Sequence, residues 1–449
     1  MTVGNPGGTV LTENLVSFDG TETCRGPLVA PDRYRDLQAL LAGPGPFAVR
    51  GGGLSYCQAS AAQGVTTIST RSFNRLLAFD PERRHLTVEP GVTVGELVRF
   101  AVSRGAWFAV LPGHPAITVG GCVGFNVHGK SQHDVGCFSD HIVSLTLLHP
   151  DRGELACSPG DNAGLFELTL GGMGLTGFIT TVTLQLQPLP GPGIRRIAHP
   201  VGNLTEAVEL MRSLAAPGGA GGTLYSWNDL NQAGPRFGRG FVYVESFEDT
   251  APASRATYRR LAADRRRWPG IAGSMLTTRL VNTGYVARER LRPRHLRSVE
   301  DAAFPINGNE AYYRLFGRRG FREYQVLVPT EVWPAAAREI QRLVAAAGAP
   351  VTLGSLKLFR GDPRLLWFHG DGVCLAIDVA ADERASRLFG QLDQMALEHG
   401  ALVNLSKDSR LDAATTRRLY PGYDEFRQRL HDYDPQRRFD SMLRRRIGV

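Results

Sequence analysis

Apolar and polar residues alternate with a period of two in several short runs of the chain, and this pattern predicts β-strands. In the first 190 residues these runs are separated by glycine-rich loops, and only two stretches have the helical period. One short strand is expected within 1–30, and the other predicted strands are 47–50, 65–68, 85–89, 142–148 and the β-branched end of 171–187. The predicted helices are 32–41 and 94–104. Short strands with few helices indicate an α+β fold.

A proline-rich stretch, PLPGP at 188–192, interrupts both periods and predicts a domain boundary. Strand and helix patterns then return, which predicts a second domain built on a sheet. Its predicted strands are 224–227, 241–245, 324–329, 351–359 and 373–379, and its predicted helices are 204–214, 332–347 and 385–399. Residues 250–300 are rich in arginine and partly helical in pattern, and 412–445 are helical in pattern.

The most unusual stretch is 112–130, PGHPAITVGGCVGFNVHGK, which contains five glycines. Glycine lets a backbone or a ligand come close, and free peptide N–H groups can then point at phosphate or carbonyl oxygens. The stretch ends with His128 and Lys130, which place a titratable imidazole beside an ammonium group. We interpret it as a binding loop. The alternative is a glycine-rich turn whose histidine lies on the surface.

Residues 172–177, GMGLTG, match the GxGxxG pattern of dinucleotide-binding proteins. That fold needs a helix directly after the glycines. Here the following residues are FITTVTLQLQ, whose β-branched alternation predicts a strand instead. A Rossmann fold is therefore excluded at this position.

Length and composition indicate a globular protein with an ample core. The chain has 449 residues, of which 43% are hydrophobic and 21% charged, which fits two domains or one large interleaved unit. It contains no apolar run of membrane-spanning length and no Sec signal at its start, so we expect a cytoplasmic protein without an integral membrane segment. The six cysteines form no CxxC pair, which argues against a metal site and a disulfide framework.

The formal net charge is +8, and only three of the 51 basic residues are lysines: Lys130, Lys357 and Lys407. A lysine retained against such a bias is a candidate for a role that arginine cannot fill, because burial can lower the pKa of an ammonium group. The alternative is chance. The arginines are spread along the chain without interleaved aromatic residues, so nucleic acid is not expected as a partner.

Three stretches, Arg50–Tyr56 (RGGGLSY), Pro112–Gly124 and Gly171–Gly177, together resemble FAD flavoproteins of the vanillyl-alcohol oxidase, or PCMH, type. The resemblance implies an α+β fold in which two small subdomains bind FAD and a cap domain covers the flavin. We therefore expect a PCMH-type FAD-binding domain at 1–190, completed by 405–449. The substrate-binding cap domain, built on an antiparallel sheet, is expected at 191–404.

The resemblance also implies which residues contact FAD, with the glycine N–H groups holding the pyrophosphate. They are Arg50, Gly51, Gly52, Gly53, Leu54, Ser55, Tyr56, Pro112, Gly113, Thr118, Gly120, Gly121, Gly124, Asn126, His128, Gly129, Gly172, Gly174, Gly177, Ile179 and Lys407. Relatives with covalent FAD carry a histidine where this chain has Leu54, so we expect noncovalent FAD. A bond to His114 is the alternative.

Further motifs narrow the resemblance to the decaprenylphosphoryl-ribose oxidases, and they are His128-Gly129-Lys130, Lys357-Leu358-Phe359, Lys407-Asp408-Ser409-Arg410, Tyr420-Pro421 and Asp434-Pro435. Such a resemblance implies oxidation of a ribose 2′-hydroxyl to a ketone, the first half of an epimerisation. The expected substrate-binding residues are Lys130, Tyr324, Gln325, Lys357, Phe359, Cys374 and Asn404. For Tyr324 and Gln325, a position in the core of the strand is the alternative. The chain departs from the family in the cap, where Glu323 replaces a glutamine, Asn404 replaces a tyrosine, and Cys374 is displaced by two positions.

Oxidation of an alcohol by flavin requires a group near the hydroxyl that removes or polarises its proton. The catalytic candidates are His128, Lys407 and Tyr56. Lys407 could have a lowered pKa near the flavin or could stabilise the negative charge of the reduced flavin. The alternatives are a surface ion pair between Lys407 and Asp408 and a structural role for His128.

The cap departures leave the substrate open. A second enzyme hypothesis is an FAD-dependent oxidase or dehydrogenase that modifies an aminosugar or cyclitol in antibiotic biosynthesis. A flavin-binding scaffold without activity would keep the glycine loops but need not keep His128 and Lys407 together. The electron acceptor, oxygen or a quinone-like molecule, and the need for a partner reductase stay open.

Overall fold

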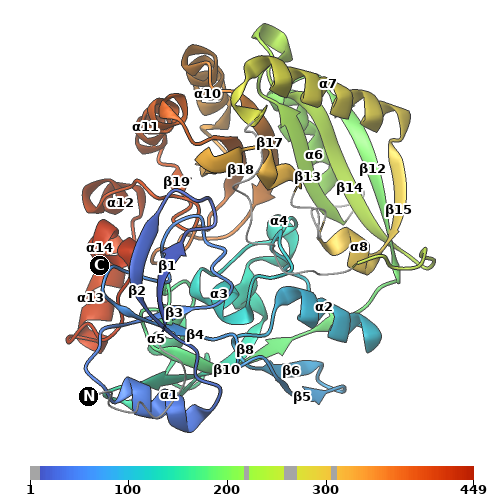
Figure 1. Ribbon diagram of the computed structural model, residues 1–449. Coiled ribbons are helices and arrows are strands. Elements are labelled where there is room, and N and C mark those ends of the chain that lie inside the picture. Colours follow the sequence, from blue (N-terminus) through green and yellow to red (C-terminus); the bar gives the residue numbers. More distant parts are fainter. Residues whose placement is uncertain (1–10, 217–221, 257–270, 305–310) are drawn as a thin grey trace.

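The structure, a computed structural model, describes residues 11–216, 222–256, 271–304 and 311–449. It has two parts, which Figure 1 shows one above the other. The lower part contains two small sheets and the C-terminal helices, and the upper part contains one large sheet with helices on its faces. None of the described helices is both long and apolar enough to cross a bilayer.

The first small sheet has four strands in the order β1-β2-β4-β3. β1 and β2 are antiparallel, and β4 is parallel to both of its neighbours. The bounds are β1 Leu11–Val16, β2 Thr23–Val29, β3 Phe47–Arg50 and β4 Thr66–Ser69, with helix α1 at Tyr34–Leu41. The glycine stretch 51–56 leaves the sheet directly at the end of β3.

The second small sheet is antiparallel, with the order β5-β6-β10-β8-β9. Its strands are β5 Leu76–Asp80, β6 His85–Val88, β8 Ile142–His149, β9 Gly153–Cys157 and β10 Phe178–Gln185. The helices of this region are α2 Val94–Ser103, α3 Val119–Gly124, α4 Gln132–Val135 and α5 Ala163–Thr169, and a two-stranded ribbon joins β7 Ala106–Trp107 to β11 Gln187–Pro188. Thus the second and third glycine stretches, 112–124 and 171–177, lie beside this sheet.

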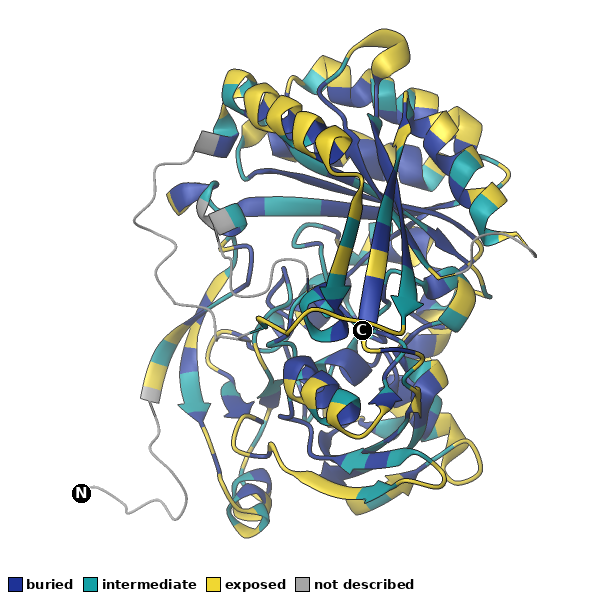
Figure 2. Cartoon of the chain, turned by 90° about the vertical axis from the view of Figure 1, so that its right-hand side faces the viewer, coloured by how far each residue is buried: buried dark blue, intermediate teal, exposed yellow. Residues whose placement is uncertain are grey.

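The upper part, which we call the cap, is built on an eight-stranded antiparallel sheet of order β15-β12-β14-β13-β17-β18-β16-β19. The strands are β12 Gly193–Val201, β13 Thr223–Asp229, β14 Arg239–Glu248, β15 Arg294–Ser298, β16 Phe321–Pro329, β17 Val351–Phe359, β18 Gly372–Ala380 and β19 Leu402–Val403. Its helices are α6 Leu204–Ala215, α7 Met275–Leu291, α8 Val299–Ala303, α9 Ala311–Arg314, α10 Trp333–Ala347 and α11 Glu383–Glu398. Figure 2 shows buried strands between helices whose outer sides are exposed.

The two faces of the cap sheet have different neighbours. Val242 and Val244 of β14 belong to the main core with α6, whereas Phe241 and Tyr243 pack against Val286 of α7. The face that carries α7 also faces the lower part at β16, β17 and β18. Side-chain alternation along these strands therefore decides which residues can reach a site between the two parts.

The chain returns to the lower part after β19. Helices α12 Ala413–Leu419, α13 Tyr423–Tyr433 and α14 Met442–Ile447 follow. The N–H of Phe47 in β3 donates to the Arg438 carbonyl, and the N–H of Asp440 donates to the Phe47 carbonyl. The C-terminal segment thus lies beside the strand that leads into the first glycine stretch.

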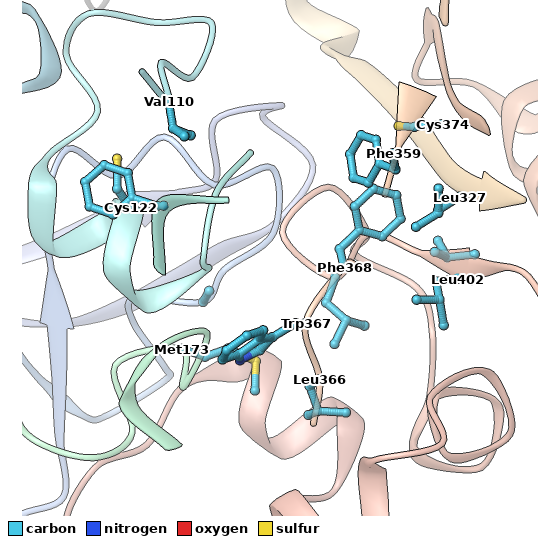
Figure 3. Packing of buried hydrophobic residues seen from close by; sticks show 14 of the residues in the cluster. Val110, Cys122, Met173, Leu327, Phe359, Leu366, Trp367, Phe368, Cys374 and Leu402 are labelled. Atoms are coloured by element: carbon cyan, nitrogen blue, oxygen red, sulfur yellow. The ribbon is translucent and has the colours of Figure 1, made fainter. Parts of the chain in front are cut away.

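Apolar side chains between β17 and β18 join the two parts. Figure 3 shows Trp367 beside Met173 of the third glycine stretch, and Phe368 beside Phe359 of β17. The Trp367 indole N–H donates to the carbonyl of Leu170. Because an aromatic side chain buries a large apolar area, this contact holds the cap against the glycine loops.

The helices and strands predicted at defined ranges are confirmed, with ends that differ by up to three residues. The strand after GMGLTG is β10, so the exclusion of a Rossmann motif is also confirmed. The stretch 112–130 was expected as a loop, yet it contains the short helix α3. Thr118, directly before the helix, caps it by accepting the Gly121 N–H. Two predictions reach outside the described residues, those for the start of 1–30 and for the middle of 250–300.

Candidate active site

A cavity of about 350 Å³ lies between the glycine stretches of the lower part and the cap strands β16, β17 and β18. This volume is within the range of sites for small molecules and cofactors. Many expected site residues line it: Gly51, Gly52, Gly53, Leu54, Ser55, Tyr56, Pro112, Gly113, Thr118, Gly120, Gly121, Gly124, Asn126, His128, Gly174, Gly177, Ile179, Gln325, Lys357, Asn404 and Lys407.

The glycines at the cavity serve two different purposes. A Cβ on Gly52 would lie 2.6 Å from the Ala116 carbonyl oxygen, and one on Gly120 would lie 2.9 Å from the Cβ of Pro90. These glycines let neighbouring loops approach each other. A Cβ on Gly113 would meet no atom within 4 Å, and one on Gly121 would meet only the Thr118 hydroxyl, at 3.3 Å. Side chains there would instead occupy the cavity.

We call the cavity wall formed by the three glycine stretches the glycine cradle. Asn126 provides a polar group for a ligand in this cradle. Its backbone is left-handed with φ of 42°, a conformation that asparagine tolerates better than most residues. Its side-chain oxygen accepts the N–H of Ser139, whereas its Nδ2 is buried without a partner among the described residues. A buried amide donor of this kind usually has a partner. The open cradle and this donor fit a cofactor with carbonyl or phosphate oxygens, such as FAD.

His128 is held as a neutral imidazole at the cavity wall. Its Nδ1 lies 3.0 Å from the Gly129 carbonyl oxygen, and because a carbonyl only accepts, Nδ1 carries the proton. Nε2 lies 3.4 Å from Oε1 of Gln325. Burial, reinforced by the positive charge of Lys357, lowers the pKa of His128 to about 3. The Nε2 lone pair is therefore available to accept a proton.

Lys407 lies at the cavity and not on the surface. Its Nζ is 3.4 Å from Oε2 of Glu323 and 3.5 Å from the centre of the Tyr56 ring. Asp408, the alternative partner, instead binds Arg410. Burial raises the pKa of Tyr56 well above its ordinary value, so its phenol stays protonated. Tyr56 can then donate a hydrogen bond but does not fit the expected role of base.

A pair of carboxyl groups lies beside Lys407. Glu323 and Asp378 are direct cross-strand partners on β16 and β18, and Oδ1 of Asp378 is buried without a hydrogen-bond partner among the described residues. The Tyr312 hydroxyl donates to Oδ2 of Asp378 at 2.6 Å. Burial, followed by the charge of Glu323, raises the pKa of Asp378 well above its ordinary value. Asp378 therefore keeps its proton beside the Glu323 side chain.

Amide groups and a lysine complete the cap side. The Nδ2 of Asn404 donates to Oε1 of Gln325 at 2.5 Å, and its Oδ1 accepts the Ser406 hydroxyl at 2.8 Å. Lys357 of β17 is buried at the same wall, and burial is the main cause that lowers its pKa. A lysine in this state presents an ammonium or a neutral amine to a ligand.

The structure places the remaining expected residues away from the cavity lining. Tyr324 is the clearest difference, since it alternates with Glu323 and Gln325 and packs its ring 5.1 Å from Phe389 on the opposite face. The prediction that Tyr324 contacts the substrate is therefore wrong, because its side chain lies on the face of β16 away from the cavity. The Nζ of Lys130 lies 3.1 Å from Oε2 of Glu245.

Other expected residues support the wall from behind. Phe359 packs its ring 4.7 Å from His128, and Cys374 is buried opposite Lys357. The Arg50 guanidinium donates to Gln58, Ser60 and Val16, so it braces the first glycine stretch. Gly129 and Gly172 pack against backbone atoms of neighbouring loops.

Sequence reasoning left several lining residues out of the site. They include Phe18, Ile117, Phe125, Met173, Tyr312, Tyr313, Glu323, Leu353, Ser355, Phe368, Ala376, Asp378 and Ser406. Among these residues, only Glu323 had a signal in the sequence. It replaces a glutamine of the family, and it is adjacent to Tyr324, which was expected in the site. Nothing local connects Tyr312 to Asp378, which lies 66 positions further along the chain.

Comparisons with known proteins agree with the chemistry of the site. The model of a family described as an FAD binding domain matches residues 28–158. The chain is 28% identical over 416 residues to decaprenylphosphoryl-beta-D-ribose oxidase of Mycolicibacterium smegmatis, covering 89% of this chain and 88% of that protein. It is 33% identical over 141 residues to L-gulonolactone oxidase of Mus musculus, which covers 31% of each chain. It is 29% identical over 150 residues to D-lactate dehydrogenase of Anaerostipes hadrus, which covers 32% of this chain and 31% of that protein.

These matches and the glycine cradle identify the chain as an FAD-dependent oxidoreductase with a PCMH-type FAD-binding domain. Of its relatives, the ribose oxidase, the gulonolactone oxidase and the lactate dehydrogenase are enzymes that act on CH–OH groups. The similarity to the Mycolicibacterium smegmatis oxidase extends over 89% of the chain. The expectations of an FAD cofactor and of enzymatic activity are thereby confirmed.

Proposed function

We propose that this protein oxidises a secondary hydroxyl of a sugar to a ketone, with a ribose-type 2′-hydroxyl as the leading substrate and epimerisation as the overall outcome. The observation that supports it is the convergence of His128, Lys407, Lys357, Gln325 and Asn404 on one cavity beside the glycine cradle. The similarity to the ribose oxidase over 89% of the chain supports the sugar as substrate. When bound, FAD supplies the acceptor for the hydride that leaves the carbinol carbon.

In this proposal His128 removes the hydroxyl proton. His128 lines the cavity, its Nε2 lies 3.4 Å from Oε1 of Gln325, and its Nδ1–H is fixed by the Gly129 carbonyl. Because the pKa of His128 is lowered to about 3, the imidazole is neutral over the working range and accepts a proton only while the alcohol is oxidised. Lys407 provides the positive charge that stabilises negative charge developing in the cavity.

Gln325, Asn404 and Lys357 orient the sugar. Gln325 and Asn404 are hydrogen-bonded to each other, which fixes the amide groups before a ligand enters. Lys357 suits a phosphate or a ring hydroxyl of the substrate. The preformed amide pair therefore reduces the entropy lost on binding.

We also propose the division into domains that the sequence predicts. Residues 1–190 with 405–449 form the FAD-binding domain with its two subdomains, and residues 191–404 form the substrate-binding cap. The return of the C-terminal segment to β3 supports this division. FAD is held without a covalent bond, because Leu54 at the first glycine stretch offers no nucleophile. Electrons pass from the flavin to oxygen, a quinone-like molecule or a partner reductase.

The test is anaerobic reduction of the purified flavoprotein by a panel of alcohols. We expect polyprenyl-phosphoryl ribose, or a simpler phosphoribosyl ether, to bleach the flavin absorbance near 450 nm, and a 2′-deoxy analogue to leave it unchanged. Bleaching by non-sugar alcohols alone would contradict the proposal. Lys130→Arg is the matched control for substitutions at the cavity, because Lys130 pairs with Glu245 and lies outside the cavity lining.

A second candidate is oxidation of an aminosugar or cyclitol in antibiotic biosynthesis. It is favoured by one observation, the Glu323–Asp378 pair, since a second ionised carboxylate beside the substrate would bind an ammonium group. Binding of an aminosugar would then ionise Asp378 and release its proton to solvent. Calorimetry in two buffers of different ionisation enthalpy would detect that release, and bleaching by aminosugars but not by ribosyl compounds would favour this candidate.

A further inference from the structure

Helix α7 buries several polar residues against the protein and exposes several large apolar ones to the solvent. Thr278, Asn282 and Glu289 are buried on its inner side, where Asn282 donates to Asp229 at 2.9 Å and Glu289 accepts from Arg196 at 2.7 Å. Among the described helices that cover the sheet, α6, α10 and α11 instead bury mostly apolar side chains. The reversal in α7 requires a separate explanation.

The outer side of α7 carries a line of leucines. The exposed fractions are 70% for Leu276, 64% for Leu280, 54% for Val281 and 83% for Leu291. At about 100° per residue, Leu276, Leu280 and Leu291 fall within roughly 60° of one another around the helix axis. Of the seven large hydrophobic residues exposed in the described part of the chain, five lie between 276 and 296. Apolar exposure concentrated on one side of one segment is typical of an interaction surface.

Positive charge borders the leucines on both sides. The exposed residues of this segment include Arg279, Arg288, Arg290, Arg292 and Arg294. The only carboxyl side chain between residues 274 and 298 is Glu289, which is buried and paired with Arg196. None of the five arginines has an ion pair with another described residue. We call the exposed leucines and arginines of 276–296 the α7 surface.

We propose that the α7 surface docks the protein onto an anionic lipid bilayer, with α7 lying in the plane of the interface. In this arrangement the leucines enter the boundary between headgroups and acyl chains, and the arginines bind lipid phosphates. A second copy of the chain is the less suitable occupant, because a symmetric contact would bring the same five arginines together. The proposal does not depend on which alcohol is oxidised.

The position of α7 is suited to this role. It lies across the sheet face at β12, β13 and β14, where Val286 packs against Trp227 and Tyr243 (Figure 1). The cavity lies under β16, β17 and β18 of the same sheet. Docking would therefore use one end of the cap and leave the glycine cradle free of contact with lipid.

The test is flotation of the FAD-loaded protein with vesicles of phosphatidylcholine alone or mixed equally with phosphatidylglycerol. We expect binding only to the mixed vesicles, and weaker binding when salt rises from about 50 mM to about 500 mM. The double variant Leu280→Glu/Leu291→Glu should lose binding. Its matched control is Leu76→Glu/Leu77→Glu, which places the same two charges at leucines exposed by 39% and 43% on β5. FAD content and the circular dichroism spectrum verify that each variant is folded.

The arginines are tested separately. Arg288→Gln/Arg290→Gln/Arg292→Gln should weaken binding to mixed vesicles by on the order of a hundredfold, about fivefold for each charge. The proposal fails if wild type does not bind mixed vesicles at low salt, or if the leucine variant binds as wild type does. It also fails if wild type self-associates at micromolar concentration and the leucine substitutions abolish that association, since the surface would then serve a second copy.

Discussion

The residue with the sharpest test is Lys407, because its ammonium group lies between Glu323 and the Tyr56 ring. Arginine keeps the positive charge but is bulkier, forked and never neutral at working pH. We expect Lys407→Arg to bind FAD and to lose roughly a hundredfold in the rate of flavin reduction, the scale of a lost proton-transfer or charge-stabilising group. Anaerobic stopped-flow absorbance with an active sugar measures this rate.

The control for that experiment is Lys130→Arg. Lys130 also contacts a carboxylate and an aromatic ring, but these belong to Glu245 and Tyr225 outside the cavity lining. An arginine there should change the rate by little. Near-normal reduction by Lys407→Arg would exclude a special role for the ammonium group and leave His128 as the base.

His128 should control the rate without adding a titration at neutral pH. Because its pKa is lowered to about 3, it is neutral from about pH 5 to pH 8, whereas an ordinary histidine would titrate there. We expect His128→Ala to lose roughly a hundredfold in the rate of flavin reduction. The rate of wild type should show no loss near pH 6.5 on its acid side. An acid limb at that pH that disappears in His128→Ala would contradict the burial argument.

Asp378 should make stability depend on pH in a defined direction. Its pKa is raised by burial in the folded protein, so the folded state holds a proton that the unfolded state releases above about pH 4. The stabilisation is full below that pH and is lost as pH rises through the raised pKa. Asp378→Asn can keep the hydrogen bond from the Tyr312 hydroxyl without ionising, so its unfolding temperature should fall less with rising pH. Asp371→Asn, at an exposed turn, should follow wild type.

At the residue scale, motifs predicted the cavity better than patterns of burial did. His128, Lys357 and Lys407 were found because each lies in a recognisable motif and two of them are rare lysines. Tyr324 was assigned to the wrong face because the motif gave its position but not the phase of strand alternation. The pairing of Glu323 with Asp378 depends on the β16–β18 register, which a single sequence does not encode locally.

At the scale of elements, α3 and the loop before it separate two uses of glycine. Gly121 faces the cavity, whereas Gly120 packs on Pro90. We expect Gly121→Val to give a folded protein with little FAD, because the side chain fills ligand space. Gly120→Val should destabilise the fold itself by roughly 1–3 kcal/mol through overpacking. Flavin absorbance and thermal unfolding of both variants distinguish the two effects.

The pair also tests the glycine cradle as a whole. Full FAD occupancy in Gly121→Val would show that the ligand lies elsewhere in the cavity. An unchanged unfolding temperature in Gly120→Val would show that the loop can move away from Pro90. Neither result was predictable from sequence, because the two glycines are adjacent and only the structure gives the neighbours of each.

The elements themselves were largely predictable from period and composition. Strands such as β10 and β17 carry β-branched and apolar alternation over their full length, so local preference and tertiary packing agree. Helix α3 was missed because its sequence, VGGCVG, has poor helix propensity. It forms where Thr118 caps its first turn and the surrounding loops fix its position.

At the scale of the whole molecule, the cavity lies where three distant segments meet. Tyr56 N–H from the first glycine stretch donates to the carbonyl of Ser406, directly before Lys407. The β17–β18 connection adds Trp367, which donates to Leu170 beside the third glycine stretch. A ligand bound between these segments would therefore contact both parts of the protein and stabilise their contact.

The last prediction concerns how FAD is attached to this assembly. Leu54 lines the cavity without a nucleophile, and Nδ1 of His114 accepts the Ala116 N–H at 3.1 Å. We expect acid or heat precipitation to release FAD into the supernatant. Because free FAD binds the folded state alone, added FAD should raise the unfolding temperature of the FAD-depleted protein, with about 2.7 kcal/mol of stabilisation at a hundred times its dissociation constant. A yellow precipitate that keeps its flavin would instead indicate a covalent bond, and loss of that colour in His114→Ala would locate it.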